Sequence, residues 1–229
     1  QDVTRYGTDF DGKPHLIELL DKLSELDFEW IRLLYLYPEM VDDTLIQYVK
    51  NNPKIAKYMD IPLQHIDDQV LKRMNRRTDE KSIRELISKL KNAGIAVRTT
   101  FICGFPGETQ EQFEKLEKFV KEVKFDYAGF FAYSREDGTP ADKLDGHIDE
   151  SVKEARAKKL AAVQERIIKT HNKELIGKQV KVIYDDIDYD KQTFVGRTQS
   201  QAPDIDNVTL FSADEEVKIG EFYTVEITG

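Results

Sequence analysis

The stretch that decides the fold reads Arg98-Thr99-Thr100-Phe101-Ile102-Cys103-Gly104-Phe105-Pro106-Gly107-Glu108-Thr109. Its first half is rich in β-branched and aromatic residues, which predicts a buried strand. Its second half, from Gly104 to Thr109, predicts a tight turn followed by the start of a helix. In parallel α/β sheets and barrels, ligands bind at the carboxyl ends of the strands, so we expect a functional site beside this turn. A turn that serves geometry alone is the alternative.

Strand and helix patterns alternate along the chain up to about residue 145. The expected strands cover residues 30–37, 58–64, 95–103 and 125–134. The expected helices cover residues 15–23, 42–49, 81–92 and 109–124. Such alternation implies parallel strands with right-handed crossovers, and strands this apolar need helices to cover them. A partial (β/α) barrel fits best, with a flavodoxin-like open sheet as the second choice.

A second unit follows the alternating region. Residues 149–175 have the pattern of one long helix, which Gly177 ends. Its expected apolar side consists of Ala155, Leu160, Val163, Ile167 and Ile168. Four short strand patterns come next, at residues 179–184, 193–198, 207–211 and 222–227, which predicts a small antiparallel barrel of the OB-like kind. We therefore expect a barrel domain over 1–148, a linking helix over 149–177 and a small β domain over 178–229.

Composition places the chain among globular proteins. Of its 229 residues, 40% are hydrophobic and 34% are charged, which is typical of a protein with a real core. One cysteine excludes a disulfide within the chain. No signal-peptide pattern opens the sequence and no run has the length of a membrane span, so we expect a cytoplasmic protein. A glycine-rich phosphate loop of the dinucleotide or Walker type is also missing from the sequence.

Negative charge is concentrated at the carboxyl end. Residues 178–229 contain five basic and eleven acidic side chains, a net charge of −6 out of −9 for the whole chain. An acidic domain is a poor electrostatic match for nucleic acid and a good one for a basic protein. Simple solubility is the alternative explanation.

Three motifs occur in an order that resembles the radical S-adenosylmethionine methylthiotransferases. They are Tyr58-Met59-Asp60-Ile61-Pro62-Leu63-Gln64-His65, Val70-Leu71-Lys72-Arg73-Met74-Asn75-Arg76-Arg77 and the stretch from Arg98 to Thr109. The resemblance implies a partial (β/α) radical-SAM barrel followed by a TRAM domain. Within the family, Asp60 to His65, Gly196-Arg197 and Ala202-Pro203-Asp204-Ile205-Asp206 are similar to the RimO branch. That branch adds a methylthio group to the β-carbon of an aspartate in small-subunit ribosomal protein twelve.

The resemblance implies S-adenosylmethionine and two 4Fe-4S clusters as cofactors. Reductive cleavage of S-adenosylmethionine then supplies a radical that removes a hydrogen atom from an unactivated carbon of the substrate. The family holds one cluster through a CxxxCxxC motif, which this sequence lacks, and Cys103 alone cannot ligate a cluster. We expect Cys103 to be a small apolar filler, and no metal ligand is assigned in this chain. We also expect the sequence to be the carboxyl-terminal part of a longer enzyme and to be inactive by itself.

By the same resemblance, six residues are expected to contact the cofactor: Gln64, Arg98, Thr100, Ile102, Gly104 and Tyr133. The Gln64 amide follows a strand and should project toward the mouth of the barrel. The Arg98 guanidinium suits the carboxylate of a methionine moiety, although it lies early in its strand. Alternatives stay open, namely a buried amide for Gln64 and a surface ion pair for Arg98.

The other four candidates surround the same strand ends. Thr100 and Ile102 share one face by strand alternation, and Ile102 is a candidate to pack against adenine. Gly104, with Gly107, would let a ligand approach the main chain. Tyr133 would close the pocket. Core packing is the alternative for Ile102 and Tyr133.

Partner contacts are expected from the small β domain. Asp185, Asp186 and Asp188 form an acidic stretch in an expected hairpin, and ribosomal proteins are generally basic. A basic cluster of Lys72, Arg73, Arg76 and Arg77 is a secondary candidate for contact with RNA, or a solvated helix face.

Two other functions remain open. One is a transfer-RNA methylthiotransferase, which the acidic tail disfavours, and the other is a non-catalytic barrel that acts as a binding module. The four histidines, His15, His65, His147 and His171, have no metal-ligand spacing and are expected at the surface or in loops.

Overall fold

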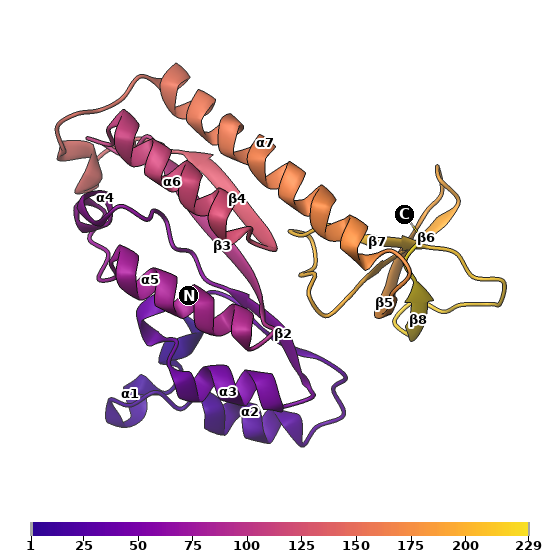
Figure 1. Ribbon diagram of the computed structural model, residues 1–229. Helices are drawn as coiled ribbons and strands as arrows, with labels where there is room; N and C mark the ends of the chain where they lie inside the picture. The colour runs from indigo at the N-terminus through magenta and orange to yellow at the C-terminus, as the bar shows by residue number, and fades with distance from the viewer. Residues whose placement is uncertain (1, 229) are drawn as a thin grey trace.

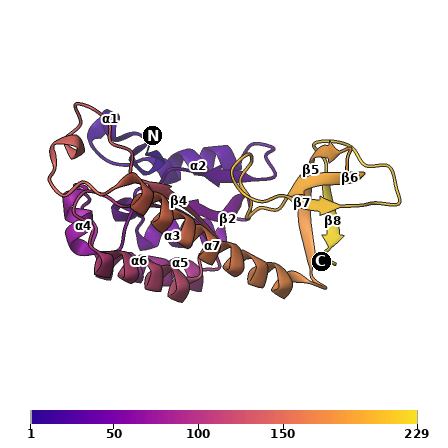
Figure 2. The same ribbon diagram turned by 90° about the horizontal axis from the view of Figure 1, so that it is seen from above.

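Two four-stranded sheets joined by one long helix make up the computed structural model, which describes residues 2–228 (Figures 1 and 2). The first region contains η1 (Val3–Arg5), α1 (Thr8–Asp11), α2 (Leu16–Ser24), β1 (Ile31–Leu33), η2 (Pro38–Met40), α3 (Asp43–Asn51), β2 (Ile55–Asp60), α4 (Asp68–Arg73), α5 (Glu80–Asn92), β3 (Ala96–Cys103), α6 (Gln110–Val123), β4 (Tyr127–Ala132) and η3 (Ala141–Lys143). The second contains α7 (Glu150–Leu175), β5 (Gln179–Asp188), β6 (Thr193–Arg197), β7 (Thr209–Phe211) and β8 (Phe222–Glu226).

The first sheet is entirely parallel, in the order β1-β2-β3-β4. Each successive strand lies beside the previous one, and a helical segment connects each pair, as in a (β/α) barrel that does not close on itself. Helices α5 and α6 lie along the same side of the sheet (Figure 1). The partial (β/α) barrel predicted from the sequence is confirmed.

Strand β3 shows why the sheet has two different faces. Its odd-numbered residues, from Val97 to Cys103, are fully buried, whereas the even-numbered ones are only half-buried. Phe101 packs edge-on against Phe119 of α6 and against Phe125, with ring centroids 6.3 Å and 5.7 Å apart. The odd-numbered face is therefore the core, and the even-numbered face is the open inner side of the partial barrel.

Several strand boundaries differ from those expected, since β5 ends at Asp188 rather than at residue 184 and both β1 and β2 are displaced. Strand β1 spans three residues rather than 30–37, and β2 covers Ile55–Asp60 rather than 58–64. Beyond Asp60 the chain still follows β3, because Ile61 N donates to Arg98 O at 2.8 Å and Gln64 N donates to Thr100 O at 2.8 Å. Pro62 has no N–H to donate, and Gln64 has φ of +70°, so a regular strand cannot continue here.

Helix α7 packs on the barrel through polar side chains as well as apolar ones. Its buried residues are Lys153, Arg156, Ala157, Leu160, Gln164 and Ile167. The expected apolar side was therefore partly wrong, since Ala155 is exposed. The Gln164 amide donates to the carbonyl oxygen of Phe125 at 2.8 Å, which explains how a polar side chain fits this interface.

The second sheet is antiparallel, in the order β7-β6-β5-β8, and confirms the small β unit expected at the carboxyl end. Its core consists of Val182, Tyr184 and Phe211. The sheet lies at the carboxyl end of α7, away from α4 and the turn after β3 (Figures 1 and 2). Among the helices described within residues 2–228, none is both long and apolar enough to span a membrane.

Candidate functional site

The carboxyl ends of β2, β3 and β4 meet at one edge of the barrel. Ile102 N donates to Gln64 O at 2.9 Å, and Tyr133 N donates to Cys103 O at 2.9 Å. Side chains also gather here, because Tyr133 and Phe105 pack edge-on at 5.1 Å and share a cluster with Ile102. The structure thus brings Gln64, Ile102 and Tyr133 together, as the sequence predicted for the mouth.

Two buried oxygen atoms at this edge lack a hydrogen-bond partner among the described residues. They are Gln64 Oε1 and Tyr133 Oη. Gln64 also adopts a left-handed backbone conformation, which is strained for a residue with a side chain. Unpaired buried oxygens are costly unless a ligand or ordered water satisfies them. This edge therefore fits a polar ligand held between the strand ends.

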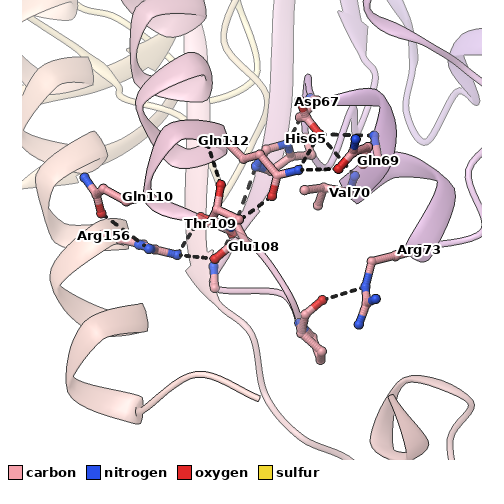
Figure 3. Close-up of polar contacts among 12 residues, drawn as sticks. His65, Asp67, Gln69, Val70, Arg73, Glu108, Thr109, Gln110, Gln112 and Arg156 are labelled. Atoms are coloured by element: carbon pink, nitrogen blue, oxygen red, sulfur yellow. Dashed lines mark hydrogen bonds and ion pairs between the residues drawn. The ribbon is translucent and has the colours of Figure 1, made fainter. Parts of the chain in front are cut away.

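Glu108 holds the turn after β3 in place. Its carboxylate is completely buried, accepts a hydrogen bond from Gly104 N, and forms an ion pair with Arg156 Nη1 of α7 at 3.0 Å (Figure 3). Burial raises the pKa of Glu108, while the Gly104 N–H and Arg156 act in the opposite direction. The following helix is capped by Thr109 together with Gln112, so Glu108 is not needed for that role.

His65 lies against this ion pair and is buried rather than exposed. It lies in the loop between β2 and α4, one of the two expected places, but the surface alternative was wrong because its side chain is 0% exposed. Its Nδ1 accepts a hydrogen bond from Asp67 N at 3.0 Å, which leaves the proton of a neutral ring on Nε2, 4.0 Å from Glu108 Oε2. Burial lowers the pKa of His65 to about 4. A neutral, buried histidine thus lies beside the β3 turn, and its Nε2 has no hydrogen-bond partner among the described residues.

Gly104 is needed for packing as well as for turn geometry. It has φ of +76°, and a Cβ there would lie 2.2 Å from Lys153 Cγ of α7. Lys153 Nζ donates to the Tyr133 carbonyl oxygen at 2.8 Å. The close neighbour of Gly104 is therefore a buried side chain of this protein, in place of the ligand expected there. Gly107 similarly faces Arg73 Cζ, at 2.9 Å.

Arg98 lies apart from the other candidates. It shares the open face of β3 with Thr100 and Ile102, but it is near the amino-terminal half of the strand. Its Nε is 3.2 Å from Asp206 Oδ1, and its Nη1 is 3.5 Å from Asp60 Oδ1. The guanidinium is thus engaged by two carboxylates, and its cofactor contact stays a prediction.

The described residues offer no cluster-binding set. Among residues 2–228 there is no group of three or more His, Cys, Asp or Glu side chains that could hold a metal ion. Cys103 is fully buried, and burial raises the pKa of its thiol to about 12, so it stays protonated. Iron–sulfur ligation does not fit this chain's own side chains.

The barrel and its carboxyl unit each match a family model. The model of the Radical SAM superfamily matches residues 2–120, and that of the TRAM domain matches residues 176–229. This chain belongs to the radical SAM superfamily. The radical SAM match covers β1, β2, β3 and most of α6, so it includes Gln64, Glu108 and the turn between β3 and α6.

Curated relatives of this radical SAM chain carry a common name. A ribosomal protein uS12 methylthiotransferase RimO of Clostridium botulinum (strain Eklund 17B / Type B) is 46% identical over 99% of this chain and 51% of its own length. One of Elusimicrobium minutum is 45% identical over 100% of this chain and 52% of its own length. The chain thus spans about half the length of the curated relatives it matches.

The fold of a solved radical SAM enzyme is also similar. Coproporphyrinogen III oxidase (HemN) from Escherichia coli aligns with a TM-score of 0.54 at 18% identity, over 67% of this chain and 36% of that chain. At this identity the likeness concerns the fold, and it agrees with the partial barrel described above.

The three acidic residues expected to bind a partner are mostly engaged within the TRAM domain. Arg197 forms a two-pronged contact with Asp185, with Nε at 2.6 Å from one carboxylate oxygen and Nη2 at 3.0 Å from the other. Asp188 is 3.2 Å from Lys191 Nζ. Asp186 is exposed. Asp206, another acidic residue of the tail, is buried against the barrel.

Two of the four residues in the basic cluster on and after α4 are engaged, whereas Lys72 and Arg77 are exposed. Arg73 donates to Pro106 O at 2.9 Å and pairs with Asp145 at 2.8 Å, and Arg76 lies over the Tyr37 ring. Sequence reasoning missed the buried group of His65, Lys153 and Arg156. The available signal was their position, since Lys153 and Arg156 share one helix face with Leu160 and Gln164.

Proposed function

We propose that this chain is the carboxyl-terminal part of a radical SAM methylthiotransferase that modifies an aspartate β-carbon of small-subunit ribosomal protein twelve in the cytoplasm. One support is the identity of about 45% to curated relatives of that name along the whole chain. The other is the barrel edge at which the carboxyl ends of β2, β3 and β4 meet. The two 4Fe-4S clusters of the whole enzyme would use cysteines that this chain does not contain.

S-adenosylmethionine would lie at the edge formed by the ends of β2, β3 and β4. When bound beside a cluster, it supplies the radical that activates a carbon–hydrogen bond. Gln64 Oε1 and Tyr133 Oη are buried oxygen atoms there with unused hydrogen-bonding capacity, and Thr100 and Ile102 line the open face. Gly104 contributes backbone, which Glu108 and Arg156 hold rigid from behind. These residues bind and orient the cofactor and exclude water.

Replacing Gln64 tests this placement in the reconstituted full-length enzyme. We expect Gln64→Ala to weaken binding of S-adenosylmethionine about tenfold, as expected for the loss of one buried hydrogen bond. Gln69→Ala is the matched control, because Gln69 carries an exposed amide in the same connection between β2 and β3. Calorimetry would measure both affinities. Equal affinities for Gln64→Ala and the unchanged enzyme would contradict the assignment.

The TRAM domain would hold the basic protein substrate through its acidic hairpin. Asp186 is the exposed member, whereas Asp185 and Asp188 are partly neutralised by Arg197 and Lys191. Reversal of Asp185, Asp186 and Asp188 to Lys should lower affinity for the ribosomal protein and flatten its salt dependence. Reversal of Asp214, Glu215 and Glu216, which are exposed elsewhere in the domain, is the control. Tight binding of transfer RNA instead would favour the other methylthiotransferase class.

A further inference from the structure

The loop between β6 and β7 leaves the TRAM domain and enters the barrel. Ala202 is 2% exposed and packs with Ala56 and Tyr58 of β2. Arg32 of β1 donates through Nη2 to the Gln201 carbonyl oxygen at 2.9 Å, and its guanidinium lies 4.5 Å from the centre of the Tyr58 ring. A TRAM segment is thus packed among the barrel strands.

Asp206 is the charged centre of this contact. Its side chain is 1% exposed, and three donors satisfy its carboxylate. Tyr58 Oη donates to Oδ2 at 2.7 Å, Arg98 Nε donates to Oδ1 at 3.2 Å, and Ala202 N donates to Oδ2 at 2.8 Å. Two of these donors belong to the barrel and one belongs to the loop itself. The carboxylate therefore shapes the loop and attaches it to the barrel at the same time.

We infer that residues 202–206 form a domain lock, which fixes the TRAM domain at the amino-terminal ends of the barrel strands. Asp206 is the positioning residue, and Arg98 and Tyr58 are the barrel residues that donate hydrogen bonds to it. A buried carboxylate that loses its partners is strongly destabilising, so the position in which Asp206 keeps all its donors is favoured over other positions of the loop. Among the acidic residues of the tail, Asp206 faces inward while its neighbour Asp204 is exposed. The lock is independent of the reaction proposed above, because it concerns only contacts within this chain.

Smaller contacts flank the lock. The Trp30 ring meets Phe222 of β8 edge-on, with centroids 4.8 Å apart. Lys181 of β5 forms an ion pair with Glu29. Both contacts join the segment just before β1 to the TRAM sheet, so they favour the same position of the TRAM domain relative to the barrel. Neither is buried as Asp206 is, which makes Asp206 the contact to remove.

Asp206→Asn, with Asp204→Asn as the matched control, tests the lock in the 229-residue chain. Both changes remove one negative charge from the same loop, and Asn tolerates the left-handed φ of +65° at position 204. Spin labels at the exposed Lys50 and Lys191 would report the distance between the barrel and the TRAM domain. We expect a narrow distribution in the unchanged chain and in Asp204→Asn, and a broad one in Asp206→Asn. Equally narrow distributions in all three, or equal broadening by both variants, would overturn the inference.

Hydrogen exchange at Ala202 gives a second readout if Asp206→Asn does not fold. Tyr58→Phe removes one donor to Asp206 and leaves the ring in the core. Exchange at the Ala202 N–H should become about tenfold faster in Tyr58→Phe, because the carboxylate that holds this N–H loses a partner. Exchange in the β3 core should stay unchanged. An unaltered Ala202 rate would count against the lock.

Discussion

His65 shows how one buried side chain sets the response of the protein to acid. Its pKa in the folded state is about 4, below the ordinary value of 6.5, because burial disfavours the charged ring. The folded state therefore resists protonation, so this contribution to stability is complete above pH 6.5 and is lost as the pH falls toward 4. Between pH ~7 and pH ~5 the loss is about 2 kcal/mol.

We expect His65→Gln to remove that part of the pH dependence. Chemical denaturation at the two pH values would give the free energy of unfolding at each. The change in this free energy with pH should be smaller in the variant than in the unchanged chain. His147→Gln, at an exposed position, should retain the slope of the unchanged chain. The interpretation of His65 fails if both variants behave alike.

Gly104 makes a second prediction at the scale of one residue. Gly104→Ala should lower the free energy of unfolding by about 3 kcal/mol, since it adds backbone strain and a clash with Lys153. Gly94→Ala is the control, because Gly94 also has positive φ but no atom lies within 4 Å of its added Cβ. That variant should lose only about 1 kcal/mol. Equal losses, measured by denaturant titration, would show that the Lys153 contact is unimportant.

At the scale of elements, α7 is attached to the barrel through a buried ion pair. Arg156→Ala would leave Glu108 buried without its charged partner, so we expect a loss of about 3–5 kcal/mol. Arg166→Ala removes the same charge from an exposed position on the same helix and should change stability by less than about 0.5 kcal/mol. Thermal unfolding of the two variants would compare them. A small effect of Arg156→Ala would mean that the other contacts of α7, including those of Lys153 and Gln164, suffice to hold the helix.

The elements themselves could be predicted because local patterns specify them. Strand β3 and helices α5 and α6 lie within a residue or two of their expected bounds, since alternation, capping residues and glycine ends are written in adjacent positions. The end of β2 could not be predicted, because the bend at Gln64 is stabilised by backbone bonds to a strand distant in sequence. The polar face of α7 was missed for the same reason, as its partners Glu108 and Tyr133 lie outside the helix.

Part of the candidate site could likewise be predicted from the sequence, and part could not. Gln64, Ile102 and Tyr133 were expected at one edge because the carboxyl ends of parallel strands meet there. Arg98 was assigned to a cofactor from its chemistry, and Asp206 was counted only among the acidic residues of the tail, although the two contact each other. A sequence shows that two opposite charges exist, but not that folding brings positions 108 residues apart together.

At the scale of the whole molecule, Trp30 is a natural reporter of the domain contact. It is the only tryptophan of the chain and lies against Phe222. If the barrel and the TRAM domain unfold as one unit, Trp30 fluorescence and far-ultraviolet circular dichroism should change at the same denaturant concentration. In Asp206→Asn the fluorescence transition should come first. Two separate transitions in the unchanged chain would contradict a rigid contact.

Helix α7 also defines a length. Its 26 residues correspond to about 39 Å along the axis. One end, at Lys153, touches the Tyr133 carbonyl beside the proposed cofactor edge, and the other leads into the TRAM sheet. If the TRAM sheet holds the substrate as proposed, the substrate would have to reach the barrel edge across this span, so the length of α7 would limit which proteins can be modified.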